Sequence, residues 1–351
     1  MNSKFVTVCS LVLFAACGAP PPVARAELWR LPIAVRPVAA AGDSSLRGLA
    51  AVDAEVAWVG GARGALFRTL DGGRSWQDVA PPDSADCDFR DVEALDRDSA
   101  LAMVAGQPAK VFRTEDGGCS WRVVLHDERP TAFFDGLAFA GDFGALFGDP
   151  IDGAFGVWTT RDAGRTWSAV PAAALPEPLP GEAAFAASGT CIAIGDEPAP
   201  VIWIATGGGA RARLLRGDPD GTWSAVDLPL CAGDAARGAF SLAVRGAGML
   251  VVGGDYRSPR RSDGSAAYSI DGGASLHEGG GGAGGYRSAV VWVDQDRGLS
   301  VGSHGTSWTM DRGFSWRILD VGGGNSLARG RDGSLWRCGD RGSVARIEPA
   351  R

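Results

Sequence analysis

The sequence predicts an all-β protein: a seven-bladed β-propeller with four antiparallel strands in each blade. The first observation is an eight-residue pattern that recurs along the chain, 45 residues apart from Asp71 to Asp116 and 46 apart from Asp116 to Asp162. This interval fits four short strands and their turns. The second observation is the abundance of glycine and proline, 52 and 20 of 351 residues, which break helices and separate short strands.

The recurring pattern reads Thr or Ser, then Asp two positions later, Gly two after that, Ser or Thr, and usually Trp. Copies lie at 69–76, 114–121, 160–167, 269–276 and 309–316, and a worn copy ends at Gly221-Thr-Trp223. Aspartate in a tight turn accepts hydrogen bonds from nearby backbone N–H groups, and glycine adopts positive φ without steric cost. We therefore expect a structural role for the five aspartates, Asp71, Asp116, Asp162, Asp271 and Asp311.

The segments around each copy supply the strands of a blade. In blade one, apolar runs at 46–50, 56–60, 65–69 and 76–79 predict four strands, which places the pattern in the hairpin between the third and fourth. Blades two to six are expected to start near Phe89, Phe133, Ala183, Ala239 and Tyr286. The segment 325–349 supplies only three strands, and 28–35 supplies one. Pairing of these two segments would complete a seventh blade and remove the open edges.

The first residues predict an export signal. Lys4 precedes an apolar run from Phe5 to Ala16, which is too short to span a bilayer. Small residues directly before Cys17 resemble a bacterial lipobox, in which the cysteine is lipidated, whereas Ala24-Arg25-Ala26 offers a competing cleavage site. We expect a signal peptide at 1–16, a Pro/Ala-rich tether at 17–27 and the propeller at 28–351. The protein would be exported, as a lipoprotein on the periplasmic face of a bacterial membrane or as a soluble periplasmic protein.

Composition excludes some classes of function. The net charge of −7 argues against a nucleic-acid-binding protein, which would usually be basic. Five cysteines follow Cys17 without any C-x-x-C spacing, at positions 87, 119, 191, 231 and 338. Neither a disulfide framework nor a zinc site is indicated, and the three histidines are scattered. We predict no metal site and no cofactor.

A binding site is predicted at the mouth of the central channel, because the innermost strand of each blade starts there. Guanidinium groups at this rim would suit carboxylate or phosphate groups. Aligned across blades, the position reads Arg47, Arg90, Asp135, Glu182 (register open), Arg237 and Arg287. The loops between second and third strands share this face and contribute Asp149, Tyr256 and Arg257. The alternative is that each arginine pairs with a local acid, such as Asp91, or is simply solvated.

The repeat is the Asp-box, also called the bacterial neuraminidase repeat. Together with Phe89-Arg-Asp91, Phe112-Arg-Thr114 and Gly148-Asp-Pro-Ile-Asp-Gly153, it makes the chain resemble the photosystem II stability/assembly factor family and its bacterial relatives. The resemblance covers nearly the whole mature chain. It implies a seven-bladed, exported protein whose motifs do not mark it as an enzyme.

Two classes of function remain open from the sequence. The first is a non-catalytic propeller that binds a protein or peptide with an acidic or carboxylate-bearing segment at the channel mouth, and that meets the membrane only through its lipid anchor. The second is a sialidase-type glycoside hydrolase, suggested by the Asp-boxes and by Trp29-Arg-Leu-Pro32. That chemistry needs a nucleophile, a neighbouring acid and a charge clamp, and only Tyr256, Tyr268 and Tyr286 could serve as the tyrosine. No catalytic constellation is evident, so the first class is preferred.

Overall fold

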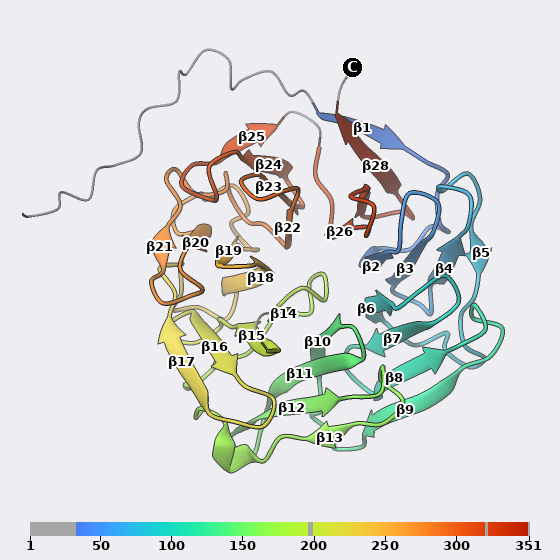
Figure 1. Ribbon diagram of the computed structural model, residues 1–351, viewed down its shortest axis with the longest axis horizontal. Coiled ribbons are helices and arrows are strands. Elements are labelled where there is room, and N and C mark those ends of the chain that lie inside the picture. The colour runs from blue at the N-terminus through green and yellow to red at the C-terminus, as the bar shows by residue number, and fades with distance from the viewer. Residues whose placement is uncertain (1–32, 196–198, 320–321, 350–351) are drawn as a thin grey trace, which may run out of the picture.

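Seven four-stranded antiparallel sheets surround one central axis (Figure 1). The computed structural model describes residues 33–195, 199–319 and 322–349. Within these ranges the only helical element is a single 3₁₀ turn, η1 (Ala172–Ala174), and no helix is long and apolar enough to span a membrane. The predicted all-β, seven-bladed propeller is confirmed.

Each blade runs outward from its innermost strand. Blades one to three consist of β2 (Leu46–Ala51), β3 (Ala57–Gly61), β4 (Leu66–Thr69) and β5 (Gln77–Asp78); β6 (Phe89–Ala94), β7 (Ala100–Val104), β8 (Ala109–Thr114) and β9 (Arg122–Asp127); and β10 (Phe134–Ala140), β11 (Phe143–Ile151), β12 (Ala154–Thr160) and β13 (Ser168–Ala169).

Blades four to six consist of β14 (Ile192–Gly195), β15 (Val201–Ala205), β16 (Arg213–Gly217) and β17 (Trp223–Asp227); β18 (Arg237–Arg245), β19 (Gly248–Asp255), β20 (Ala266–Ser269) and β21 (His277–Glu278); and β22 (Ala289–Trp292), β23 (Gly298–Gly302), β24 (Gly305–Thr309) and β25 (Arg317–Leu319). The predicted blade starts agree closely except in blade four, where β14 begins at Ile192 instead of near Ala183.

Blade seven joins the two ends of the described chain. It consists of β26 (Ser326–Arg329), β27 (Leu335–Cys338) and β28 (Val344–Pro349), with β1 (Ile33–Pro37) as its outermost strand. In the pairing of β1 with β28, Val35 lies opposite Ile347. The predicted closure is confirmed for residues 33–35, and residues 28–32 lie outside the described ranges. So do the predicted signal peptide, Cys17 and the tether.

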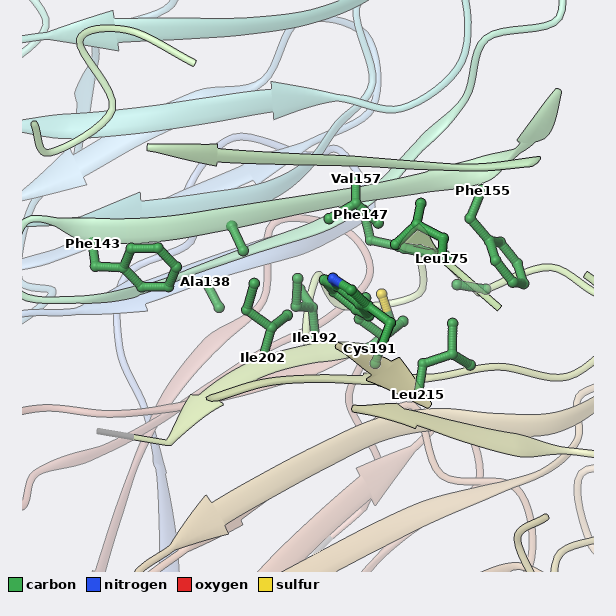
Figure 2. Close-up of a cluster of buried hydrophobic side chains, with 14 residues drawn as sticks. Ala138, Phe143, Phe147, Phe155, Val157, Leu175, Cys191, Ile192, Ile202 and Leu215 are labelled. Atoms are coloured by element: carbon green, nitrogen blue, oxygen red, sulfur yellow. The ribbon is translucent and has the colours of Figure 1, made fainter. Parts of the chain in front are cut away.

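Seven apolar clusters hold the ring together, one between each pair of adjacent blades. Figure 2 shows the cluster between blades three and four, which includes Phe147, Val157, Ile202 and Leu215. Because each sheet is covered on both faces, its central strands are apolar at nearly every position, as in β3 and β7. The five described cysteines carry free thiols within this part of the chain.

The Asp-boxes act as turn clamps. In the first box, the carboxylate of Asp71 accepts hydrogen bonds from the backbone N–H of Ser75 (2.9 Å) and from the hydroxyls of Ser75 (2.7 Å) and Thr69 (2.9 Å). The same bonds recur at Asp116, Asp162, Asp271 and Asp311. Hydrogen bonds from the serine lower the pKa of Asp71 to about 2.

Box tryptophans also connect neighbouring blades. The indole N–H of Trp121 donates to the carbonyl of Val79 in the preceding blade (2.7 Å). The ring of Trp121 also lies edge-on to that of Trp58, with centroids 6.3 Å apart. The aspartate bonds within each turn and the indole bonds of Trp76 and Trp121 fit the expected structural role of the boxes.

Candidate binding face at the channel mouth

A β-bulge at the start of the innermost strand is the repeated feature of the channel mouth. The extra residue of the bulge is Arg47 in β2, Arg90 in β6, Asp135 in β10 and Phe240 in β18, because strand pairing skips these positions. A bulge turns its extra side chain out of the regular alternation. The bulged residues therefore define the rim position that the sequence alignment aimed to identify.

The predicted column of four arginines is wrong at two positions. In blade six, Ala289 pairs with Val301 as Gly48 pairs with Gly60 in blade one. Arg287 therefore occupies the place of the core residue Leu46, and Ser288 occupies the rim. In blade five, Arg237 lies three residues before Phe240. The alignment failed because each of these arginines precedes the rim position of its blade, and that position cannot be located from sequence.

Arg287 is accordingly buried, with 1% of its surface exposed. Its guanidinium donates to the hydroxyl of Ser307 (2.6 Å) and to the carbonyl of Tyr286 (2.9 Å), and no acid pairs with it in the described residues. Burial lowers its pKa to about 10. Arg287 thus contributes to packing inside blade six and faces no ligand at the channel mouth.

The other three arginines of the predicted column differ in whether their guanidinium groups pair with a nearby acid. Arg237 pairs with Asp255 of its own blade (2.9 Å). Arg90 pairs with Asp88 (2.8 Å) and donates to the carbonyl of Ala186 (3.2 Å). The side chain of Arg47 forms no hydrogen bond or ion pair within the described residues, and its charge acts on Asp340 and Tyr286. The local-pairing alternative therefore holds for Arg237 and Arg90, and Arg47 keeps its guanidinium available.

A segment of blade four closes the channel at this end. Residues 182–190, here called the channel plug, precede β14 and reach into the centre of the ring (Figure 1). The hydroxyl of Ser188 donates to the carbonyl of Ser288 (2.6 Å), and that of Ser326 donates to the carbonyl of Ser188 (3.4 Å). With Arg90 on Ala186, the plug contacts blades two, six and seven.

The plug starts from a buried ion pair. The side chain of Glu182 is fully buried and bonds the guanidinium of Arg213, with 2.8 Å between Oε1 and Nε, and the hydroxyl of Thr206 (2.6 Å). The tentative alignment of Glu182 with the rim is wrong. The backbone carbonyl of Thr190 accepts from the N–H of Leu242 in the next blade, whereas in blade two the side chain of Asp91 accepts from the N–H of Leu137 in blade three.

Two predicted acids lie together beneath the plug. Asp149 accepts from the N–H of Ala184 (3.1 Å), and burial raises its pKa to about 6. Asp135 is completely buried, and neither of its oxygens has a hydrogen-bond partner in the described structure. Burial and the adjacent carboxylate of Asp149 raise the pKa of Asp135 well above its usual value. Both carboxyl groups therefore hold their protons to a higher pH than ordinary aspartates do.

An aromatic cluster completes the face, and sequence reasoning found only part of it. Phe185 of the plug stacks on Phe240 with centroids 3.8 Å apart, and Tyr286 meets Phe240 edge-on at 4.8 Å. The predicted Tyr256 packs against both Phe240 and Tyr286 and remains 45% exposed. Its neighbour Arg257 lies 5.7 Å from the Tyr256 ring centroid. Phe185 and Phe240 were missed because the alignment placed other residues at the rim.

The described residues do not form the tyrosine–carboxylate pair that sialidase-type chemistry needs. In the described ranges no tyrosine hydroxyl forms a hydrogen bond with a carboxylate. Burial raises the pKa of Tyr286 to about 12, which disfavours its use as a nucleophile. The described residues also hold no group of three His, Cys, Asp or Glu side chains arranged to bind a metal.

The fold and its turns define a closed, seven-bladed Asp-box propeller. Residues 34–227, more than half of the chain, match the family described as photosynthesis system II assembly factor YCF48. The chain belongs to this family, as its motifs indicated. None of the curated proteins is similar enough in sequence to count as a match.

Solved structures share the fold at low sequence identity. A structure described as YCF48 bound to D1 peptide is 15% identical, has a TM-score of 0.59, and aligns over 91% of this chain and 96% of its own. YCF48 from Cyanidioschyzon merolae is 14% identical with a TM-score of 0.60, over 90% and 99%. The Neurospora crassa Pan2 WD40 domain is 10% identical with a TM-score of 0.58, over 88% and 90%.

Proposed function

We propose that the protein is a non-catalytic, exported propeller that holds a protein or peptide segment across its channel-mouth face, as an assembly factor does. The observation that carries the proposal is the unpaired guanidinium of Arg47 on the same face as the exposed ring of Tyr256. The charge of Arg47 acts on Tyr286, and the ring of Tyr286 contacts that of Tyr256. Arg47 and Tyr256 therefore both lie beside the same aromatic cluster.

The plug determines how a partner would bind. Because residues 182–190 fill the mouth, a segment would lie across the face without entering the channel. Exposed aromatic rings supply contact area at small entropic cost, and an unpaired guanidinium suits a carboxylate. We therefore propose an acidic side chain or a carboxyl terminus near Arg47, and an apolar residue against Tyr256. The peptide bound in the related YCF48 structure supports this type of partner.

Binding can be tested with a displayed peptide library that includes the D1 peptide, followed by fluorescence anisotropy on the selected peptides. We expect Arg47→Gln and Tyr256→Ala to weaken binding about tenfold or more, because each removes a contact without disturbing a core residue. Arg74→Gln, in an exposed Asp-box, is the matched control and should bind as the wild type does. Equal affinities for all four proteins would refute the proposed face.

The proposed location is the periplasmic face of a bacterial membrane, through a lipid on Cys17, or the periplasm as a soluble protein after cleavage near Ala26. Full-length protein expressed in a bacterium should partition into detergent if it is lipidated, and Cys17→Ser should release it into the aqueous fraction. Equal partitioning of both proteins into the aqueous periplasmic fraction would favour the soluble form. Retention of both in the cytoplasm would contradict export.

A further inference from the structure

The channel is open at its other end, on the face that carries the Asp-boxes. Two adjoining pockets lie there, of about 530 Å³ and about 350 Å³. Both are lined by Glu93, Phe139 and Arg329, so they form one continuous double pocket. Together they collect the ends of the innermost strands from all seven blades. Their two compartments differ in chemistry, which limits what can bind.

The larger compartment is basic. It is lined by Arg113, Arg165, Arg329 and Arg331. Arg329 and Arg331 donate to backbone carbonyls of Val293 (3.3 Å) and Leu95 (2.5 Å), and neither forms an ion pair with any described acid.

Arg113 faces them from the other side of the basic compartment. It is 2% exposed and is held by the carbonyl of Ala163 (2.9 Å) and the carboxylate of Glu115 (2.5 Å). Asp96, which also lines this compartment, is occupied by the N–H groups of Asp98 and Ser99 in its own turn. Asp142 also lines this compartment, and the charge of Arg331 acts on Asp96, so of these two arginines only Arg329 has no assigned acid among the described residues.

The smaller compartment combines aliphatic side chains with Arg245, Arg329 and Glu93. Its walls include Ile192, Leu242, Val244 and Val290, and it reaches Thr190 at the end of the channel plug. The hydroxyl of Thr190 is bonded to that of Ser241 (2.6 Å), which fixes this end of the plug in place. A shallow compartment with aliphatic walls suits a short hydrocarbon chain, and the plug beneath it would stop a through-going segment.

Glu93 is the acid where the compartments meet. Burial, together with the nearby Asp91, raises its pKa well above the usual value, which favours the protonated form of its carboxyl group. In its protonated form this carboxyl group adds no repulsion toward an anion. No hydrogen bond from a described residue occupies it, so it can also donate one to a ligand.

We propose that this double pocket binds an anionic amphiphile: a carboxylate with an unbranched hydrocarbon chain, its head group on Arg329 and Arg331 and its chain in the aliphatic compartment. Charge complementarity and the apolar walls together select this class, because a small anion would leave the walls solvated and a neutral chain would leave the arginines unused. The site lies at the opposite end of the channel from the proposed peptide-binding face and does not depend on it.

Titration calorimetry with octanoate tests the proposal, with acetate and 1-octanol as the head-only and chain-only probes. We expect saturable binding of octanoate that is about tenfold or more tighter than binding of either probe. The double variant Arg329→Gln, Arg331→Gln should weaken octanoate binding about tenfold. Val244→Asp should also weaken it, because it places a carboxylate among the aliphatic side chains that line the smaller compartment. The control Arg312→Gln, an exposed arginine on the same face that pairs with Asp296, should bind as the wild type does.

Three outcomes would overturn the proposal. Acetate binding as tightly as octanoate would reduce the site to a simple anion site. If 1-octanol bound as tightly as octanoate, the arginines would make no contribution to ligand binding. Unchanged octanoate binding in both pocket variants would place the ligand elsewhere. Peptide binding by the arginine double variant should equal that of the wild type. The proposal of an amphiphile site and the proposal of a peptide-binding face can therefore be refuted independently.

Discussion

A Cβ atom on Gly189 would lie 2.1 Å from Cγ of Asp91, so the channel plug passes over that carboxyl group with no room for a side chain. Gly189 also has a φ of +78°, which side chains rarely adopt. The contact joins a residue just before blade four to a residue at the start of blade two. The channel plug therefore requires a glycine at position 189, because a side chain there would collide with Asp91 at the start of blade two.

We expect Gly189→Ala to destabilise the protein by about 2–4 kcal/mol, because a methyl group adds overpacking to the strain at positive φ. Denaturant unfolding measures the change. Gly153→Ala is the matched control, since Gly153 has a φ of +80° and no heavy atom within 4 Å of its ideal Cβ. This control should lose only about 1 kcal/mol. Equal losses in the two variants would mean that the contact with Asp91 is not limiting.

The acids beneath the plug predict a pH dependence of stability. The folded-state pKa of Asp149 is raised from 3.8 to about 6, so the unfolded chain releases this proton at lower pH than the folded chain does. Between these values the folded state binds more protons, and stability falls as pH rises. Above the folded pKa the loss is complete, and below the unfolded pKa it is absent.

Asp149→Asn should therefore be more stable than the wild type by about 1–2 kcal/mol near pH 8, with the difference disappearing near pH 4. The amide keeps an acceptor for the N–H of Ala184 and removes the charge next to Asp135. Denaturant unfolding across this pH range measures the effect. A difference of constant size at every pH would contradict the assignment of the proton to this pair.

The ion pair at the start of the plug should be much more sensitive than an exposed pair. Arg213→Ala would leave the buried carboxylate of Glu182 without its cation, and we expect a loss of about 3–5 kcal/mol. Arg211→Ala removes an exposed pair with Asp227 and should cost less than about 1 kcal/mol. Similar losses in both variants would show that Glu182 finds another partner when the plug rearranges.

The Asp-boxes are predicted to matter for stability without contributing to ligand binding. Asp116→Ala removes the acceptor for Ser120 and Thr114 at one turn, and we expect the melting temperature to fall by a few degrees. Peptide affinity should be unchanged, because the box lies at the opposite end of the blade from the channel mouth. A variant with wild-type melting and no peptide binding would move the functional face to the box end.

The sequence predicts the ring well because each blade repeats its own local signals. Asp-box turns and apolar strands recur at regular spacing, so the blade count and the closure by β1 follow from local rules. The rim could not be predicted as well, because a bulge shifts the register by one residue without a sequence signal. That shift separates Arg287 from Arg47. The plug was missed because its contacts, such as Ser188 with Ser288, depend on tertiary structure alone.

The last prediction separates these two arginines experimentally. Arg47 is unpaired in the described structure, so Arg47→Met should leave the melting temperature unchanged and weaken peptide binding about tenfold or more. Arg287 is buried without an acid, so Arg287→Met should change stability by less than about 1 kcal/mol, because removal of a buried charge offsets the lost hydrogen bonds. Arg287→Ala leaves a cavity and should cost about 3 kcal/mol. Neither substitution at Arg287 should alter peptide affinity, because its guanidinium faces Ser307 inside blade six.

Anisotropy and thermal unfolding on all three variants give the comparison. A loss of peptide binding in Arg287→Met at native stability would restore Arg287 to the rim and overturn the register described for blade six.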